Sequence, residues 1–269
     1  MEHEPQNAPE MVTANIKLAG PDWEMQTAIS VPKGPTSSRQ LLPVAQAFAD
    51  KVVDAAIQAS ESQGAKISCK KGCGACCRQL VPIAETEAHH IRDVITALPE
   101  PRRTEIRARF SAAQRKLADA GLLEKLQEPS RQWEAGESVT FGLTYFAQGI
   151  PCPFLEDGAC SIYADRPIAC REYLVTSPAE NCAEPTAQTV QTIPLPLKIW
   201  TAVARFDEVP VDAHFIRWVP LILAPEWADT HPQETPARPG PELLQELFDN
   251  MQKTGSALTR PGEQETENL

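Results

Sequence analysis

Eight cysteines arranged as two groups of four constrain this chain more than any other feature of its 269 residues. The first group is Cys69, Cys73, Cys76 and Cys77, and the second group is Cys152, Cys160, Cys170 and Cys182. Because a tetrahedral metal site takes four thiolates, two groups of four leave no cysteine over. We therefore predict that all eight are metal ligands, in two sites or in one polynuclear site.

The first group has the pattern C-x3-C-x2-C-C, whose short spacing lets several thiolates converge on one centre. Gly72 and Gly74 allow the backbone to fold tightly there. The alternative, that these cysteines are small buried apolar residues, fits poorly with a loop rich in lysine and glycine. The adjacent Cys76 and Cys77 point in different directions, so we expect one of them to join the second group. Such interleaving would couple metal binding to folding.

Four thiolates can hold either zinc or an iron-sulfur cluster, so both metals stay open. The all-cysteine donor set with its adjacent pair favours iron, whereas the lack of a recognisable electron-donor or substrate motif favours zinc. We expect His89 and His90 to be solvent-facing helix residues rather than ligands. Five flanking cations either offset thiolate charge or keep the loops solvated. They are Lys70, Lys71, Arg78, Arg166 and Arg171.

Charge and composition exclude several classes of protein. Asp and Glu number 36 against 25 Lys and Arg, and the net charge of -11 repels nucleic acid and anionic membranes. No apolar stretch approaches the roughly 18 residues that a membrane-spanning helix needs. The first residues lack the basic and apolar regions of a secretory signal, so we expect a cytoplasmic protein. Disulfides are rare in that reducing compartment, which makes metal the leading explanation for the cysteines.

Hydrophobic periodicity predicts a mainly α-helical, loop-rich domain organised around cysteine-ligated metal, with a short N-terminal β-hairpin. The helical pattern covers 38–63, 84–98 and 102–126, and shorter patterns cover 195–206 and 241–251. The hairpin pairs 12–18 with 25–31, the run 215–223 is apolar without a defined type, and 259–269 resembles a frayed tail. We divide the chain into an N-terminal arm (1–36), a cysteine-cluster metal-binding domain (37–228), and a C-terminal helix and tail (229–269).

Around the cysteines the sequence resembles the YkgJ-like cysteine-cluster family, which is described as chelating zinc or iron. The resemblance covers roughly 65–185. It rests on C-x2-C-C from Cys73, Cys-Pro-Phe-Leu from Cys152, Gly-x-Cys-x-Ile-Tyr from Gly158, Arg166-Pro167, and Cys-Arg-x-Tyr from Cys170. It implies metal chelation. The flagellin lysine N-methylases carry a similar cysteine domain, but we find no glycine-rich nucleotide loop for S-adenosylmethionine here.

Several roles fit this donor set. The chain is an iron-sulfur protein with a redox or protein-modifying role, a zinc-stabilised interaction module, or a metal carrier without catalysis. The spacing from Cys69 to Cys76 matches that of radical S-adenosylmethionine enzymes, but those enzymes use a repeated βα architecture that this sequence does not predict. We identify no catalytic residue and no protein partner from the sequence.

Overall fold

The computed structural model describes residues 9–20, 23–128, 136–186, 188–206, 216–232 and 236–257. In these ranges the chain is mainly helical and has only short antiparallel strand pairs besides one longer hairpin, which confirms the predicted fold class. No helix within these ranges is long and apolar enough to cross a membrane. The predicted tail at 259–269 lies outside the described residues.

The predicted N-terminal hairpin is present. Strand β1 (Met11–Ala19) pairs antiparallel with β2 (Glu24–Pro32) in a continuous register. Alternate residues of β2, Met25, Ile29 and Val31, are buried, as expected for a strand with one face on the core. The outer strand β1 remains largely exposed.

Helix α1 (Ser38–Ser62) confirms the strongest helical prediction. The Ser37 hydroxyl accepts from the Gln40 amide, and the Gln40 side chain accepts from the Ser37 amide, so both ends of a capping box are satisfied. Gly64, at a φ of 87°, follows the end of the helix. With 3.6 residues per turn, α1 has two opposite faces. One buried apolar face consists of Leu41, Ala45, Phe48, Val52 and Ala55. The opposite face consists of Asp50, Val53, Asp54 and Ile57.

The helix predicted over 102–126 is interrupted, which corrects the prediction. Helix α3 (Arg102–Asp119) ends before Gly121, which has a φ of 69°, and the Leu122 amide donates back to the Leu117 carbonyl. A glycine in the left-handed conformation is a common helix C-cap, and here it ends α3. The short α4 (Leu123–Leu126) follows. Apolar periodicity continued across the glycine because both helices contribute to one core.

The remaining elements are short, apart from three of the helices. The helices are α2 (Glu85–Ala97), α5 (Glu137–Ala147), α6 (Ile168–Glu172), α7 (Ala179–Ala183), α8 (Ile199–Ala204), α9 (Ala224–Thr230) and α10 (Gly240–Ala257), with 3-10 turns η1 (Tyr163–Asp165) and η2 (Leu221–Leu223). The strand pairs are β3 (Pro35–Thr36) with β8 (Arg238–Pro239), β4 (Pro82–Ile83) with β7 (Val219–Pro220), and β5 (Leu155–Glu156) with β6 (Ala159–Cys160). The apolar run at 215–223 thus contains β7 and η2.

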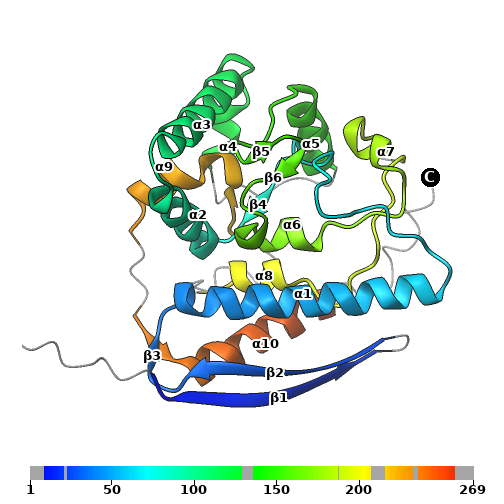
Figure 1. Ribbon diagram of the computed structural model, residues 1–269, viewed down its shortest axis with the longest axis vertical. Coiled ribbons are helices and arrows are strands. Elements are labelled where there is room, and N and C mark those ends of the chain that lie inside the picture. Colours follow the sequence, from blue (N-terminus) through cyan, green and yellow to red (C-terminus); the bar gives the residue numbers. More distant parts are fainter. Residues whose placement is uncertain are drawn as a thin grey trace, which may run out of the picture.

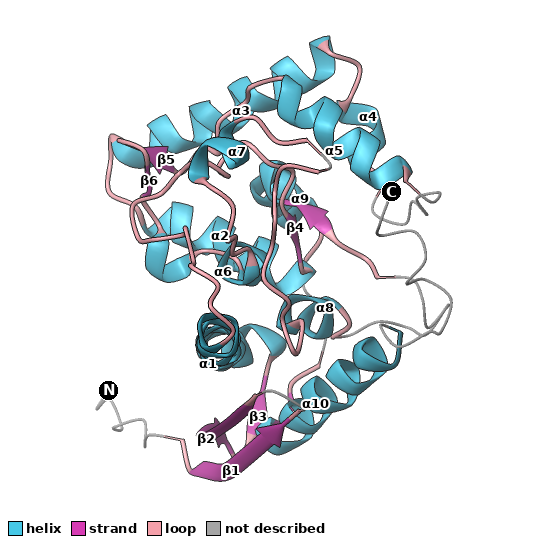
Figure 2. Cartoon of the chain, turned by 90° about the vertical axis from the view of Figure 1, so that its right-hand side faces the viewer, coloured by secondary structure: helices cyan, strands magenta, loops and turns pink. Residues whose placement is uncertain are grey.

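Helix α1 crosses the middle of the molecule and separates two sides (Figures 1 and 2). On one side, the hairpin and α10 pack with α1 and α8 around an apolar core. On the other side lie the cysteine-bearing segments, next to a second apolar core shared by α2, α3, α5 and η2. The cysteines therefore lie between α1 and the second core.

Candidate metal centre

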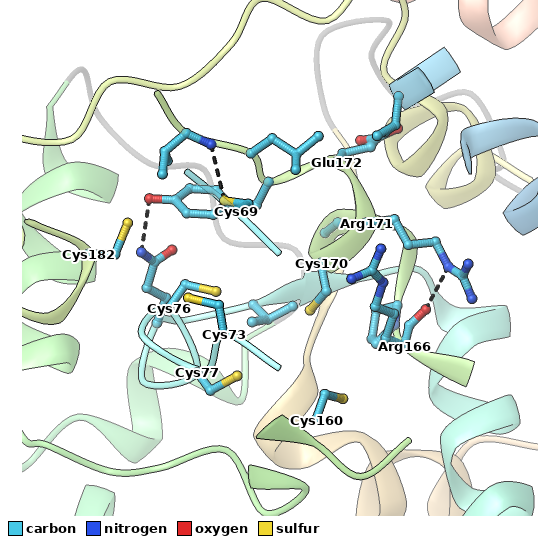
Figure 3. A pocket seen from close by; sticks show the side chains of 18 of the residues that line it. Cys69, Cys73, Cys76, Cys77, Cys160, Arg166, Cys170, Arg171, Glu172 and Cys182 are labelled. Carbon is cyan, nitrogen blue, oxygen red and sulfur yellow. Dashed lines mark hydrogen bonds between the residues drawn. The ribbon is translucent and has the colours of Figure 1, made fainter. Parts of the chain in front are cut away.

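All eight cysteines line one cavity of about 1110 Å³. The two groups come from loops that are about 75 residues apart in sequence (152 against 77), yet both groups line the same space, and Figure 3 labels seven of the eight cysteines. Seven of the cysteines are partly buried, and Cys182 is buried. The structure thus brings together every cysteine that the sequence singled out.

The first cysteine group occupies a tight loop, as its glycines indicated. The Cys73 amide donates to the Lys70 carbonyl at 3.0 Å, and the Cys77 amide donates to the Gly74 carbonyl at 3.0 Å. The Cys69 sulfur accepts from the Val175 amide at 3.3 Å. These turns direct several thiols of a short segment into the cavity.

The two cysteine loops are in direct backbone contact. The Cys152 amide donates to the Cys77 carbonyl at 2.7 Å. A Cβ atom placed on Gly74 would lie 2.5 Å from the Gly158 carbonyl oxygen, so only glycine fits where the loops meet. The two loops are therefore held side by side by protein contacts alone.

The second cysteine group is presented by short elements. Cys152 precedes β5, and Cys160 ends β6, where it is paired with Leu155. Cys170 lies on α6 and Cys182 lies on α7. A hydrogen bond of 3.0 Å from the Gln79 side chain to the Tyr173 hydroxyl also joins the two groups.

The cavity makes thiolates costly without a cation. Burial raises the pKa of Cys152 to about 12 and that of Cys182 to about 11. Burial also raises the pKa of Cys170, and the hydrogen bond with Cys77 together with burial raises the pKa of Cys76. Neighbouring thiols add to each of these shifts. Since metal ligands are thiolates, a bound cation would supply the charge that this site needs, and binding would release protons.

Arg166 is the flanking cation with the clearest electrostatic effect on the thiols. Its charge lowers the pKa of Cys69, Cys76 and Cys160 against the larger upward effects on each thiol. The guanidinium is centred 4.0 Å from the Tyr163 ring centroid, which fixes its position. Lys70 and Lys71 also line the cavity. For Arg166, charge compensation is therefore favoured over simple solvation of the loop.

Arg171 has a different contact set although it also lines the cavity. It is 6% exposed and donates to Asp50 of α1 at 2.7 Å and to the carbonyl oxygens of Arg166 and Ala164. The side chain therefore ties α6 to α1.

Two buried carboxylates, Glu87 and Glu172, were not identified from the sequence. Glu87 accepts from the Ile168 amide at 2.7 Å and the Ala84 amide at 2.9 Å. Glu172 accepts from the Ile199 amide at 2.5 Å, and burial raises the pKa of Glu172 to about 8. Glu87 stands three residues after the N-cap residue Ala84 and accepts from its amide, but an alanine at the cap gives no capping-box signal in the sequence. The sequence around Glu172 offers no signal of burial either.

The expectation that both histidines face solvent is wrong for His89. Its side chain is 3% exposed and packs edge-on against Trp227, with ring centroids 5.5 Å apart. His90 is partly buried, with its Nε2 3.3 Å from Asp165. Neither histidine is among the residues that line the thiol cavity.

The donor set that faces the cavity is dominated by sulfur, which suits zinc or iron better than the oxygen-preferring calcium or magnesium. In the described part of the chain, no three Cys, His, Asp or Glu side chains are grouped closely enough to hold a single metal ion as they stand. The thiols are arranged around the cavity rather than about one point. Their chemistry fits a thiolate-bound metal.

A helical scaffold with a cavity lined by eight thiols defines a class of cysteine-cluster metal-binding domains. Residues 68–191 match the family model CxxCxxCC, described as "Putative zinc- or iron-chelating domain". This part of the chain is therefore a domain of the YkgJ-like family. The match includes all eight cysteines and leaves out the hairpin, α1 and α10. No curated protein and no solved structure matches the chain.

Proposed function

We propose that the eight cysteines hold iron as iron-sulfur centres and that the protein has a redox or protein-modifying role. The observation that carries this proposal is the convergence of all eight thiols on one cavity of about 1110 Å³. Each thiolate of a cluster binds its own iron, so clusters suit thiols spread around a space, whereas a zinc ion needs four sulfurs at about 2.3 Å.

Groups that tune a cluster potential accompany the thiols. The Val175 amide donates to the Cys69 sulfur, and the Arg166 cation acts on three of the thiols. Hydrogen bonds to cluster sulfurs and nearby positive charge both favour the more reduced, more negative state of a cluster. These contacts support an electron-transfer role over storage of metal.

Domain limits and location are part of the same proposal. A cysteine domain over 37–228 is flanked by an arm at 1–36 and by a helix and tail at 229–269. Reduced thiols suit the cytoplasm, and the net charge of -11 disfavours nucleic acid as a partner.

The test is anaerobic purification of the full chain, followed by iron, sulfide and zinc analysis and a visible spectrum of the same sample. We expect a brown protein with iron and acid-labile sulfide, whose colour bleaches on reduction. The Ala75→Ser variant, altered inside the cavity without loss of a thiol, should keep the same content. A colourless protein with stoichiometric zinc and no sulfide would overturn the proposal.

Zinc is the second candidate, as the metal of an interaction module or carrier. The direct contact between the cysteine loops favours it, because a structural zinc site needs only to hold such loops together. If zinc is found, a stable metal content during dialysis against chelator would support the module, and rapid exchange would support the carrier.

A further inference from the structure

We infer that the outer edge of the N-terminal hairpin is an interface between two copies of this chain, which pair β1 with β1 into one antiparallel sheet. Strand β1 is bonded to β2 along one edge, and within the described ranges no strand pairs with its other edge. Figures 1 and 2 both show β1 at the rim of the molecule. This inference goes beyond the proposed function and does not depend on the metal.

The odd-numbered residues of β1 provide the backbone groups of this outer edge. At one end of the hairpin the Lys33 amide donates to the Glu10 carbonyl at 2.7 Å, and at the other end the Gly20 amide donates to the Trp23 carbonyl at 2.8 Å. Hydrogen-bonded positions alternate along an antiparallel pair, so the even-numbered residues of β1 bond to β2. The odd-numbered residues direct their amides and carbonyls away from β2. They are Met11, Thr13, Asn15, Lys17 and Ala19.

The edge of β1 lacks the features that usually prevent the addition of another strand. Such features include prolines, bulges and charged side chains. Strand β1 contains no proline, and its register with β2 runs without a bulge. Its one charged residue, Lys17, lies 3.5 Å from Glu24 of β2, which offsets the charge. The backbone of β1 is therefore suited to pairing with a further strand.

The far edge of β2 is less suited to strand addition. Pro32 occupies one of its outward positions and has no amide hydrogen to donate. The carbonyl oxygen of Pro32 also lies against the start of α10, since a Cβ atom placed on Gly240 would be 2.1 Å away from it. The hairpin thus favours β1 as the interface.

A second copy fits this edge because β1 is complementary to itself. When Asn15 of one copy lies opposite Asn15 of the second copy, all nine residues of each strand are paired about a two-fold axis. Lys17 of each copy then lies opposite Thr13 of the other. A register centred on Lys17 would pair fewer residues and would set two lysines opposite each other, which is unfavourable.

The core-facing side of β1 supplies apolar pairs in the same register. Ala14, Ile16 and Leu18 pack against the core, whereas Val12 on the same side is exposed. In the dimer Val12 lies opposite Leu18 of the second copy, and Ala14 lies opposite Ile16. Apolar cross-strand pairs stabilise a sheet, and this pairing covers the exposed Val12. These contacts favour a second copy over a polar partner.

Proline substitutions on the two edges of the hairpin test the inference, with sedimentation analysis of the full chain as the readout. The unaltered chain should be dimeric at about 100 µM, since a single strand pair is a small interface that binds weakly. Asn15→Pro should be monomeric, because it removes the outward amide at the centre of the interface and no hydrogen bond within the hairpin. Ala28→Pro is the matched control. Ala28 is the exposed partner of Asn15 in the hairpin, its amide points to the far edge of β2, and this variant should stay dimeric.

A monomeric unaltered chain, or a dimer that survives Asn15→Pro, would overturn the inference. If either proline disrupts the hairpin itself, hydrogen exchange of the unaltered chain at single-residue resolution decides. Protection of the Thr13, Asn15 and Lys17 amides should rise roughly 10-fold or more between dilute and concentrated samples, while the Ala14 and Ile16 amides should not change. Protection of the odd-numbered amides that is the same at every concentration would show that no second copy covers this edge, and would overturn the inference.

Discussion

The two sides of α1 are held together in different ways. On the hairpin side, regular elements bury side chains such as Phe48, Leu243 and Leu247 almost completely. On the cavity side, short turns present half-buried cysteines next to the second apolar core, and a few hydrogen bonds join the cysteine loops. Apolar burial stabilises the first side without a ligand, whereas we expect the cysteine loops of the second side to gain stability when their thiols bind a metal. The comparison predicts a chain that combines conventional apolar cores with a ligand-dependent loop region.

Removal of the metal should give the largest effect and should separate the two sides. In chelator with reductant, amides of the cysteine loops, including Ser68 and Cys152, should lose protection from hydrogen exchange by roughly 100-fold or more. Amides of α1 and β2 should change far less, since their core contains no cysteine. Hydrogen exchange with mass spectrometry reads both sides in one sample. Equal loss everywhere would mean that the hairpin side also depends on metal.

A cavity created in the apolar core of the hairpin side should destabilise that side first. Leu247 is fully buried, so Leu247→Ala should lower the free energy of unfolding by about 2–5 kcal/mol in a denaturant titration. Metal content of the folded chain should stay unchanged. Leu143→Ala is the control, because Leu143 is 37% exposed and loses little burial. Loss of metal in the folded Leu247→Ala chain would show that the two sides are not independent.

Arg171 links the two sides, so its removal should affect both. Arg171→Ala removes the hydrogen bonds to Asp50 and to two carbonyl oxygens. This should lower the free energy of unfolding by about 2–4 kcal/mol. Metal content should also fall, because α6 carries Cys170. The exposed pair Arg103–Glu100 provides the control. Arg103→Ala should lower the free energy of unfolding by less than about 1 kcal/mol and should leave the metal content unchanged. If the two variants behave alike, Arg171 does not couple the sides.

The smallest effect concerns acid stability of the cavity side. Burial, followed by the charges of Arg92, Arg39 and His231, lowers the pKa of His89 to about 4. Between pH 6.5 and 4 the unfolded chain binds a proton at this residue that the folded chain does not, so stability falls as pH falls through that window. His89→Gln should remove this part of the decline, as measured by melting temperature against pH. An unchanged slope in His89→Gln would assign the decline to other groups.

Prediction from the sequence succeeded where apolar residues repeat with the period of a strand or a helix, because that repeat follows from one buried face. The alternation in β2 and the 3.6-residue period in α1 both follow from one buried face, so both elements were predictable. The cysteines were recognised by type and spacing. The way in which the two cysteine loops meet was not predictable, because the contact between Cys77 and Cys152 joins segments far apart in the chain. For the same reason the buried Glu172, bonded to amides that lie 27 and 28 residues further along, gave no sign in the sequence.

The opposite faces of α1 should be visible in a genetic experiment. In a complete mutational scan of this helix, polar substitutions at positions 41, 45, 48, 52 and 55 would reduce the amount of protein that accumulates. Substitutions at positions 54 and 57, on the opposite face, would instead change metal loading at nearly normal abundance. Two phenotypes would thus alternate along one helix with the same helical period and half a turn out of phase.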